Sequence, residues 1–137
     1  MFRSSRCVEA VFENLQVQYD KTNDQEMDIY LTGIGLENID GFTFAFQCID
    51  ENEIQMFAVL VEDVEEKKVE RLIEELGEIN RHLRFFSLFL DDNNNVVLGY
   101  TYFMVSSFEE SVQQVISLMN STMQAIDAFI PDVMTYV

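Results

Sequence analysis

The segment that decides the fold is Phe42-Thr43-Phe44-Ala45-Phe46-Gln47-Cys48. Apolar side chains at every second position alternate with smaller or polar ones, which is the two-residue period of a β-strand with one buried face. A polar segment at 50–53 follows, and residues 54–60 then repeat the alternation with Ile54, Met56, Ala58 and Leu60. Two alternating runs joined by a short polar turn predict a β-hairpin.

Helical periodicity occurs in three places outside this hairpin. Residues 5–15, residues 65–82 and a segment from near Ser107 to near Pro131 carry apolar side chains three and four positions apart. Ser107 with Glu110 three residues later forms the sequence pattern of a helix-capping box. The apolar stripe of the middle helix is expected to be Val69, Leu72, Ile73, Leu76, Ile79 and Leu83.

The remaining segments predict further strands and turns. We expect short strands at 16–20 and 28–31 around a polar turn at 21–26, and an irregular connection at 34–40. A second hairpin is expected at 84–104, with its turn at 91–95. Because the strands are grouped in runs, the order predicts an α+β fold. Its antiparallel sheet has about five to six strands with helices packed on it, in a single domain over residues 1–137.

Both faces of the predicted sheet are apolar, which is unusual for a sheet with one face in water. If Met56 and Leu60 point inward, then Phe57, Val59 and Val61 point outward. In the next strand Phe85 and Phe89 share one face, and Phe86, Leu88 and Leu90 share the other. Three explanations are open: the last or the first helix crosses to cover the second face, the chain self-associates through it, or another protein binds there.

The charge balance excludes several classes of partner. The chain has 137 residues, with 8 basic against 25 acidic side chains, and its net charge is −17. Nucleic-acid binders need Lys and Arg to displace counterions from phosphates, so we expect no nucleic-acid partner. The same charge repels anionic membrane surfaces. A hydrophobic content of 48% is far above that of disordered chains.

The two cysteines favour a reducing compartment. Cys7 and Cys48 lie in a predicted helix and a predicted strand, where we expect them to be small buried side chains. A disulfide between them is possible, and any redox role stays open, but two thiols in a chain of this size fit the cytoplasm better. We expect no secretory signal, because no apolar stretch follows the first arginines. No apolar run reaches the ~20 residues that span a bilayer.

No segment predicts catalysis or a cofactor. The run from Asp91 to Asn95 begins like a calcium-binding loop, but Val96 and Tyr102 stand where that loop needs a glycine and an acid. It is expected to be a solvated turn. The single histidine, His82, fits the end of a helix. We therefore assign no catalytic, cofactor-binding or metal-binding residue.

The sequence around the second hairpin resembles the YbjN-like family of bacterial proteins. The residues that carry the resemblance are Leu76-Gly77-Glu78-Ile79-Asn80-Arg81, the aromatic-rich run 83–92 and Asn95-Val96-Val97-Leu98-Gly99-Tyr100. Members have a helix closing on an Asn, an aromatic strand, an acidic turn, a returning strand and a long last helix. Where members often carry a second Asn, this chain has His82 and Leu83. The resemblance implies a fold similar to type III secretion chaperones, which are small, acidic and commonly dimeric.

These observations together predict a non-enzymatic protein-binding or chaperone-like regulatory module. It would act as a homodimer and bury an extended or helical partner segment against an apolar sheet or helix surface. An acidic rim would select basic partners. The alternative is a small-molecule sensor with a pocket between the last helix and the sheet.

Overall fold

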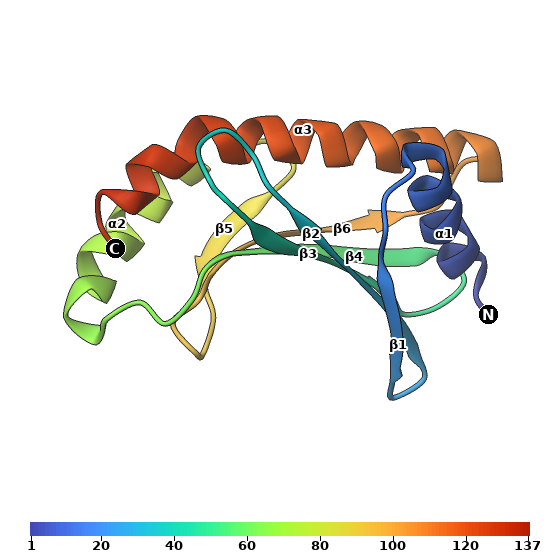
Figure 1. The fold of residues 1–137 in the computed structure, drawn as a ribbon, viewed down its shortest axis with the longest axis horizontal. Helices are drawn as coiled ribbons and strands as arrows, with labels where there is room; N and C mark the ends of the chain where they lie inside the picture. The colour runs from blue at the N-terminus through green and yellow to red at the C-terminus, as the bar shows by residue number, and fades with distance from the viewer.

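The computed structural model describes residues 1–137 and contains one six-stranded antiparallel sheet and three α-helices (Figure 1). Across the sheet the strand order is β1-β2-β3-β4-β6-β5, so neighbours are mostly consecutive in sequence. This arrangement confirms the predicted α+β fold. The elements are α1 (Arg3–Leu15), β1 (Asp20–Asp24), β2 (Met27–Ile34), β3 (Phe42–Cys48), β4 (Glu53–Val61), the 3₁₀ turn η1 (Glu66–Lys68), α2 (Val69–Asn80), β5 (Ser87–Leu90), β6 (Val96–Phe103) and α3 (Phe108–Met134).

The helices leave one face of the sheet uncovered. Figure 1 shows α3 running along the upper face of the sheet, and α1 lies beside the first turns of α3. Helix α2 lies at the far end of the sheet, where it packs against β5 and α3. The sheet arches, and the β1–β2 hairpin and the β5–β6 turn both point away from α3. The uncovered lower face is therefore concave.

The core lies between the upper face of the sheet and the helices α1 and α3. Phe44 and Phe46 of β3 stack with ring centroids 5.0 Å apart, and Phe12 of α1 meets Phe46 edge-on at 5.3 Å. From α3, Met119 and Ile126 are fully buried against the same cluster. Burying each such side chain contributes roughly 1.5–3 kcal/mol, so the stripes of α1 and α3 fix both helices to this face.

Helix α3 begins where the sequence predicts and ends later. The Ser107 side-chain oxygen accepts a hydrogen bond from the Glu110 N–H at 3.2 Å, which confirms the predicted N-cap. The helix continues past Pro131 to Met134. Pro131 has no N–H for the carbonyl of Asp127 four residues earlier. The Asn38 side-chain amide donates to that carbonyl at 2.9 Å instead, which allows the helix to pass the proline.

The β1–β2 hairpin differs from the prediction. Residues 16–20 do not form a strand and residues 21–26 are not a turn, because β1 spans Asp20–Asp24. The turn is the pair Gln25 and Glu26, both at positive φ (49° and 70°), which is the geometry of a two-residue hairpin turn. Strand β1 is exposed along its whole length. It therefore carries no alternation of apolar and polar residues for sequence reasoning to find.

Three smaller expectations also need correction. Helix α2 is shorter than residues 65–82, and Ile73 of its expected apolar stripe is 53% exposed. Strand β5 covers only the second half of residues 84–90. A bulge in β4 pairs Val61 with Val96 rather than continuing the register, so Val61 packs against the core instead of pointing outward.

Candidate functional site

The concave lower face of the sheet is the most distinctive surface of the molecule, and we call it the open face. Cross-strand partners share one face of a sheet, so the strand register defines its members. They are Met27, Ile29, Leu31 and Gly33 of β2; Thr43, Ala45 and Gln47 of β3; Gln55, Phe57 and Val59 of β4; Ser87 and Phe89 of β5; and Val97, Gly99 and Thr101 of β6.

By the same register Asp20, Thr22 and Asp24 of β1 and the pair Glu53 and Phe103 also lie on this face, at its margins. The centre of the face is uncharged, although 24% of the residues in the chain are charged. Apolar side chains lie on both sides of the face, on β2 and on the strands β4, β5 and β6, with β3 between them. Phe89 pairs with Val97, and Val97 pairs with Val59. Phe89 is 39% exposed and Leu31 is 37% exposed. The structure thus confirms the prediction of an apolar second face and shows that neither α1 nor α3 crosses to cover it (Figure 1).

The ring of Phe57 lies over Gly99, its cross-strand partner, which has no side chain. Phe57 and Gly99 are directly opposite each other on β4 and β6. A Cβ atom added to Gly99 would lie 2.9 Å from Cδ1 of the Phe57 ring, closer than a carbon contact allows. A missing side chain on one strand therefore makes room for an aromatic ring from its neighbour.

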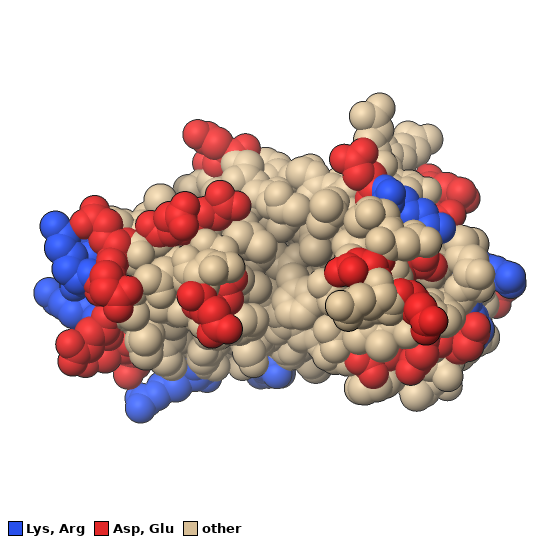
Figure 2. All heavy atoms as spheres, turned by 90° about the horizontal axis from the view of Figure 1, so that it is seen from below, with Lys and Arg blue, Asp and Glu red and all other residues tan.

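Carboxylates border the open face. Figure 2 looks onto this face and shows a broad uncharged centre, hollowed near the middle, with acidic side chains around it. By register, Asp20 lies opposite Leu31, Asp24 opposite Met27 and Glu53 opposite Phe103. We call these three carboxylates the acidic rim. They place negative charge beside apolar surface at two margins of the face.

The open face has shallow hollows at two of its margins. One, of about 670 Å³, lies beside β1 and β2 and is lined by Asp20, Leu31 and neighbours. The other, of about 430 Å³, includes Thr43, Val59 and Glu62 at the far ends of β3 and β4. Each joins open-face residues to a carboxylate, so both suit a polymer segment that lies across the surface.

The two edges of the sheet are protected differently. Strand β1 carries Asp20, Lys21 and Asp24, and such charges discourage pairing with another strand. Strand β5 has no charged residue. There the Asn80 amide donates to the Leu88 carbonyl and accepts from the Leu88 N–H, both at 2.8 Å. These two hydrogen bonds join the end of α2 to the edge of β5.

A polar network lies on the opposite face, under α1. The Ser5 hydroxyl donates to the nearly buried Asp28 carboxylate at 2.5 Å. The Glu9 carboxylate accepts from the Tyr30 hydroxyl and pairs with Lys21 at 3.0 Å. Desolvation alone would raise the pKa of Glu9, but the hydrogen bonds from Tyr30 and Lys21 lower it overall. Each polar group has a partner, so this network attaches α1 to the sheet.

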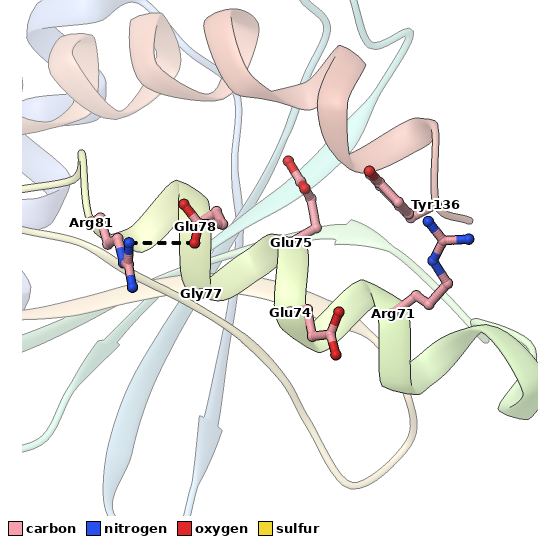
Figure 3. A pocket seen from close by; sticks show the side chains of 7 residues that line it. All are labelled: Arg71, Glu74, Glu75, Gly77, Glu78, Arg81 and Tyr136. Atoms are coloured by element: carbon pink, nitrogen blue, oxygen red, sulfur yellow. Dashed lines mark ion pairs between the residues drawn. The ribbon is translucent and has the colours of Figure 1, made fainter.

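A groove of about 500 Å³ lies on the outside of α2, away from the open face (Figure 3). Arg81 forms an ion pair with Glu78 at 3.4 Å, and the Arg71 guanidinium lies 5.6 Å from the centre of the Tyr136 ring. Glu74 and Glu75 point to opposite sides of the helix. The cations of this groove already have partners on the protein, and the carboxylates do not converge on one point.

The residues considered for chemistry in the sequence are not brought together. Asp91 accepts hydrogen bonds from the backbone N–H groups of Asn93 and Asn95, both at 2.9 Å, which confirms the solvated turn. His82 lies just beyond the end of α2. No three His, Cys, Asp or Glu side chains are grouped so that they could hold a metal ion. No helix is both long and apolar enough to cross a membrane.

Cys7 and Cys48 are both fully buried free thiols, as expected of small core side chains. Burial raises the pKa of each thiol to about 11. Both therefore stay protonated at neutral pH, the form that is neither a nucleophile nor a metal ligand.

Sequence reasoning found part of the open face and missed its margins. It identified Phe57 and Val59 as outward-pointing, and it placed Phe89 on the opposite face from Leu88 without choosing which of the two is exposed. It did not place Ile29 and Leu31 there, because the strand was expected only at 28–31. The alternation of Met27, Ile29 and Leu31 with Asp28, Tyr30 and Thr32 was the available signal. The residues of the acidic rim could not be predicted, because the cross-strand register that places them cannot be read from the local sequence of either strand.

Comparison with known proteins gives the family. The profile described as "T3SS (YopN, CesT) and YbjN peptide-binding chaperone 1", or TY-Chap1, matches residues 5–134. The chain belongs to the TY-Chap1 family. The YbjN-like resemblance of residues 76–100 is thereby confirmed and extends over almost the whole chain. A search of curated proteins finds no match.

The fold of this TY-Chap1 member is similar to that of a solved protein. The crystal structure of YbjN from E. coli superposes with a TM-score of 0.63, at 14% sequence identity, over 91% of this chain and 90% of that chain. At this identity the likeness concerns the fold. The family description names a chaperone that binds peptides, and a bound peptide needs an accessible surface of the kind that the open face provides.

Proposed function

We propose that this protein binds segments of other proteins on the open face, and that the acidic rim favours segments with basic residues beside an apolar centre. The observation that carries the proposal is a sheet face with an uncharged, partly apolar centre that no helix covers. The family description, a peptide-binding chaperone, supports a protein partner.

Free-energy arguments favour such a ligand. Burying apolar area contributes roughly 25 cal/mol of favourable free energy per Å². A segment that covers Leu31, Phe57 and Phe89 therefore gains binding free energy from each of the three side chains. An uncharged centre adds no cost for desolvating charges. Basic residues at the ends of the segment would meet Asp20, Asp24 or Glu53, where exposed ion pairs contribute mainly to selectivity and association rate.

Labelled peptides test the apolar part of this proposal. Fluorescence anisotropy would compare short peptides with an apolar centre flanked by Lys against the same centre flanked by Glu. We expect the Lys-flanked peptide to bind and Leu31→Ser to weaken it by roughly tenfold, about 1.4 kcal/mol. Ile73→Ser is the matched control, because Ile73 is an exposed apolar residue away from the open face. Equal weakening by both substitutions would exclude the open face as the binding surface.

A matched pair of substitutions tests the acidic rim. Asp20→Asn should reduce the preference for Lys over Glu flanks, whereas Asp132→Asn on the exposed side of α3 should not. The preference should also fall as salt rises, because screening weakens interactions between exposed charges. A preference that neither Asp20→Asn nor salt changes would rule out the rim as a selectivity element.

We also propose that two copies of the chain associate through the same open face. Each copy carries a charge of −17, so self-association is least opposed through a surface whose centre is uncharged. Light scattering at two concentrations should then give about twice the 16.0 kDa chain mass. Adding the Lys-flanked peptide should lower that mass, because peptide and second copy compete. One chain mass at both concentrations would overturn the homodimer and leave the peptide proposal standing.

The alternative small-molecule sensor has less support. A hollow of about 400 Å³ lies between β6 and α3, lined by Tyr102, Gln113, Gln114, Ser117 and Leu118. Tyr102 already donates to the Gln114 side chain across it. Ligand pockets enclose most of their ligand, and this hollow lies at the exposed margin of α3.

A further inference from the structure

The outer edge of β5 has the properties of a strand-addition site. An edge strand presents backbone N–H and C=O groups that another strand can pair with. Natural edges are usually protected by charges, as β1 is by Asp20, Lys21 and Asp24. Strand β5, Ser87-Leu88-Phe89-Leu90, has none, and Phe85 just before it is 67% exposed. Apolar segments with high strand propensity and no charge are the ones that pair between chains.

Helix α2 packs against β5, and the side chain of its last residue, Asn80, takes the backbone hydrogen bonds of this edge. The N–H and C=O of Leu88 both point away from β6, because both bond to the Asn80 side chain at 2.8 Å. One N–H and the carbonyl oxygen of the Asn80 amide take the places of a backbone donor and acceptor, so Asn80 imitates a residue of a seventh strand. Asn80 is the last residue of α2, and the buried Leu76 and Ile79 anchor that end of the helix.

We propose that the outer edge of β5 is a latent strand-addition site for a second copy of this chain, held closed by Asn80. The site is distinct from the peptide-binding proposal, because it uses backbone groups at the edge of the sheet rather than side chains on the open face. With Asn80 in place, the edge is satisfied within one chain. Without it, two unpaired backbone groups become available to another strand.

A second copy is the occupant that the charges favour. An antiparallel pair of β5 strands related by a two-fold axis at Leu88 would join uncharged residues only. Pairing through β1 would instead bring Asp20 and Asp24 of one copy near those of the other, in molecules that already carry −17 each. The same self-complementary pairing continues the sheet from one chain into the next.

The test compares four proteins by light scattering at two concentrations: wild type, Asn80→Ala, Ser87→Lys and the double variant. Asn80→Ala should raise the molar mass above that of wild type, by at least one additional chain at the higher concentration. Ser87→Lys puts a charge on the edge strand. Because Ser87 also lies on the open face, the Ser87→Lys single variant is the reference for the double variant, and in that background Asn80→Ala should no longer raise the mass. Circular dichroism would verify that each variant is folded.

The Ser87→Lys substitution also separates strand addition from general aggregation. It reduces the magnitude of the net charge of −17, so a nonspecific effect of charge would increase association rather than reduce it. Asn80→Ser, a milder change that cannot reach both Leu88 groups, gives a second measurement should Asn80→Ala unfold. The proposal is wrong if a folded Asn80 variant keeps the wild-type mass, or if its mass rises equally in the Ser87→Lys background.

Discussion

Two asparagine side chains in this fold each take the place of a backbone partner. Asn80 satisfies both peptide groups of Leu88 at the edge of β5, and Asn38 donates to the carbonyl that Pro131 leaves without an N–H. In both places a buried or constrained backbone group would otherwise lack a hydrogen bond, which costs ~1–3 kcal/mol where water cannot replace it. At the scale of single residues, amide side chains complete the hydrogen bonding at the ends of regular elements.

The two cysteines allow a prediction at the same scale. Because burial raises the pKa of Cys7 and Cys48 to about 11, we expect both thiols to resist a thiol reagent such as DTNB in the folded protein at pH 8. The thiolate fraction there is more than ~100-fold below that of an ordinary exposed cysteine. Both thiols should react at the ordinary rate in denaturant. Rapid labelling of the native chain would show that α1 separates readily from the sheet.

The connection before β3 and the end of α3 depend on each other. Asn38 donates its backbone N–H to the Asp127 carboxylate at 2.8 Å and its side-chain amide to the Asp127 carbonyl at 2.9 Å. We expect Asn38→Ala to lower the free energy of unfolding by about 0.5–1.5 kcal/mol, because it removes the second of these bonds. In a Pro131→Ala background the loss should be smaller, because the new N–H at position 131 can donate to Asp127.

Urea unfolding of the four proteins in this double-mutant cycle gives the coupling between the two sites. Equal losses in both backgrounds would show that Asn38 does not compensate for the proline. Asn120→Ala, on the exposed side of α3, is a control for replacing an asparagine that makes no such bond. It should have little effect on the free energy of unfolding.

The elements that sequence reasoning located well are those with strong periodicity. Strand β3 was predicted at residues 42–48 because one face is buried and every second side chain is apolar. Strand β1 was missed because it is exposed on both faces. The prediction for α2 was too long at both ends: it included the 3₁₀ turn η1, and it continued beyond Asn80 because Leu83 keeps the apolar spacing. Local patterns report burial. They do not report register, and register is what assembles the open face from five strands and places Asp20 opposite Leu31.

The whole molecule combines a large net charge with few ion pairs, and this predicts how salt affects its stability. Four ion pairs are formed, all between partly or fully exposed side chains, so attractive interactions contribute little. The folded state instead holds 25 acidic groups closer together than the unfolded chain does. Raising the ionic strength from ~10 mM to ~100 mM shortens the Debye length from ~30 Å to ~10 Å, which screens this repulsion.

We therefore expect added NaCl to raise the free energy of unfolding by about 1 kcal/mol, and the melting temperature by roughly 2–8 °C. The effect should shrink near pH 3, where most carboxylates are protonated and the repulsion is already reduced. Thermal melts at the two salt concentrations and the two pH values check both statements. A melting temperature that falls with salt at pH 7 would mean that specific attractions outweigh the general repulsion. In that case the acidic residues, including the rim of the open face, would be engaged with partners inside the chain rather than free to select a basic ligand.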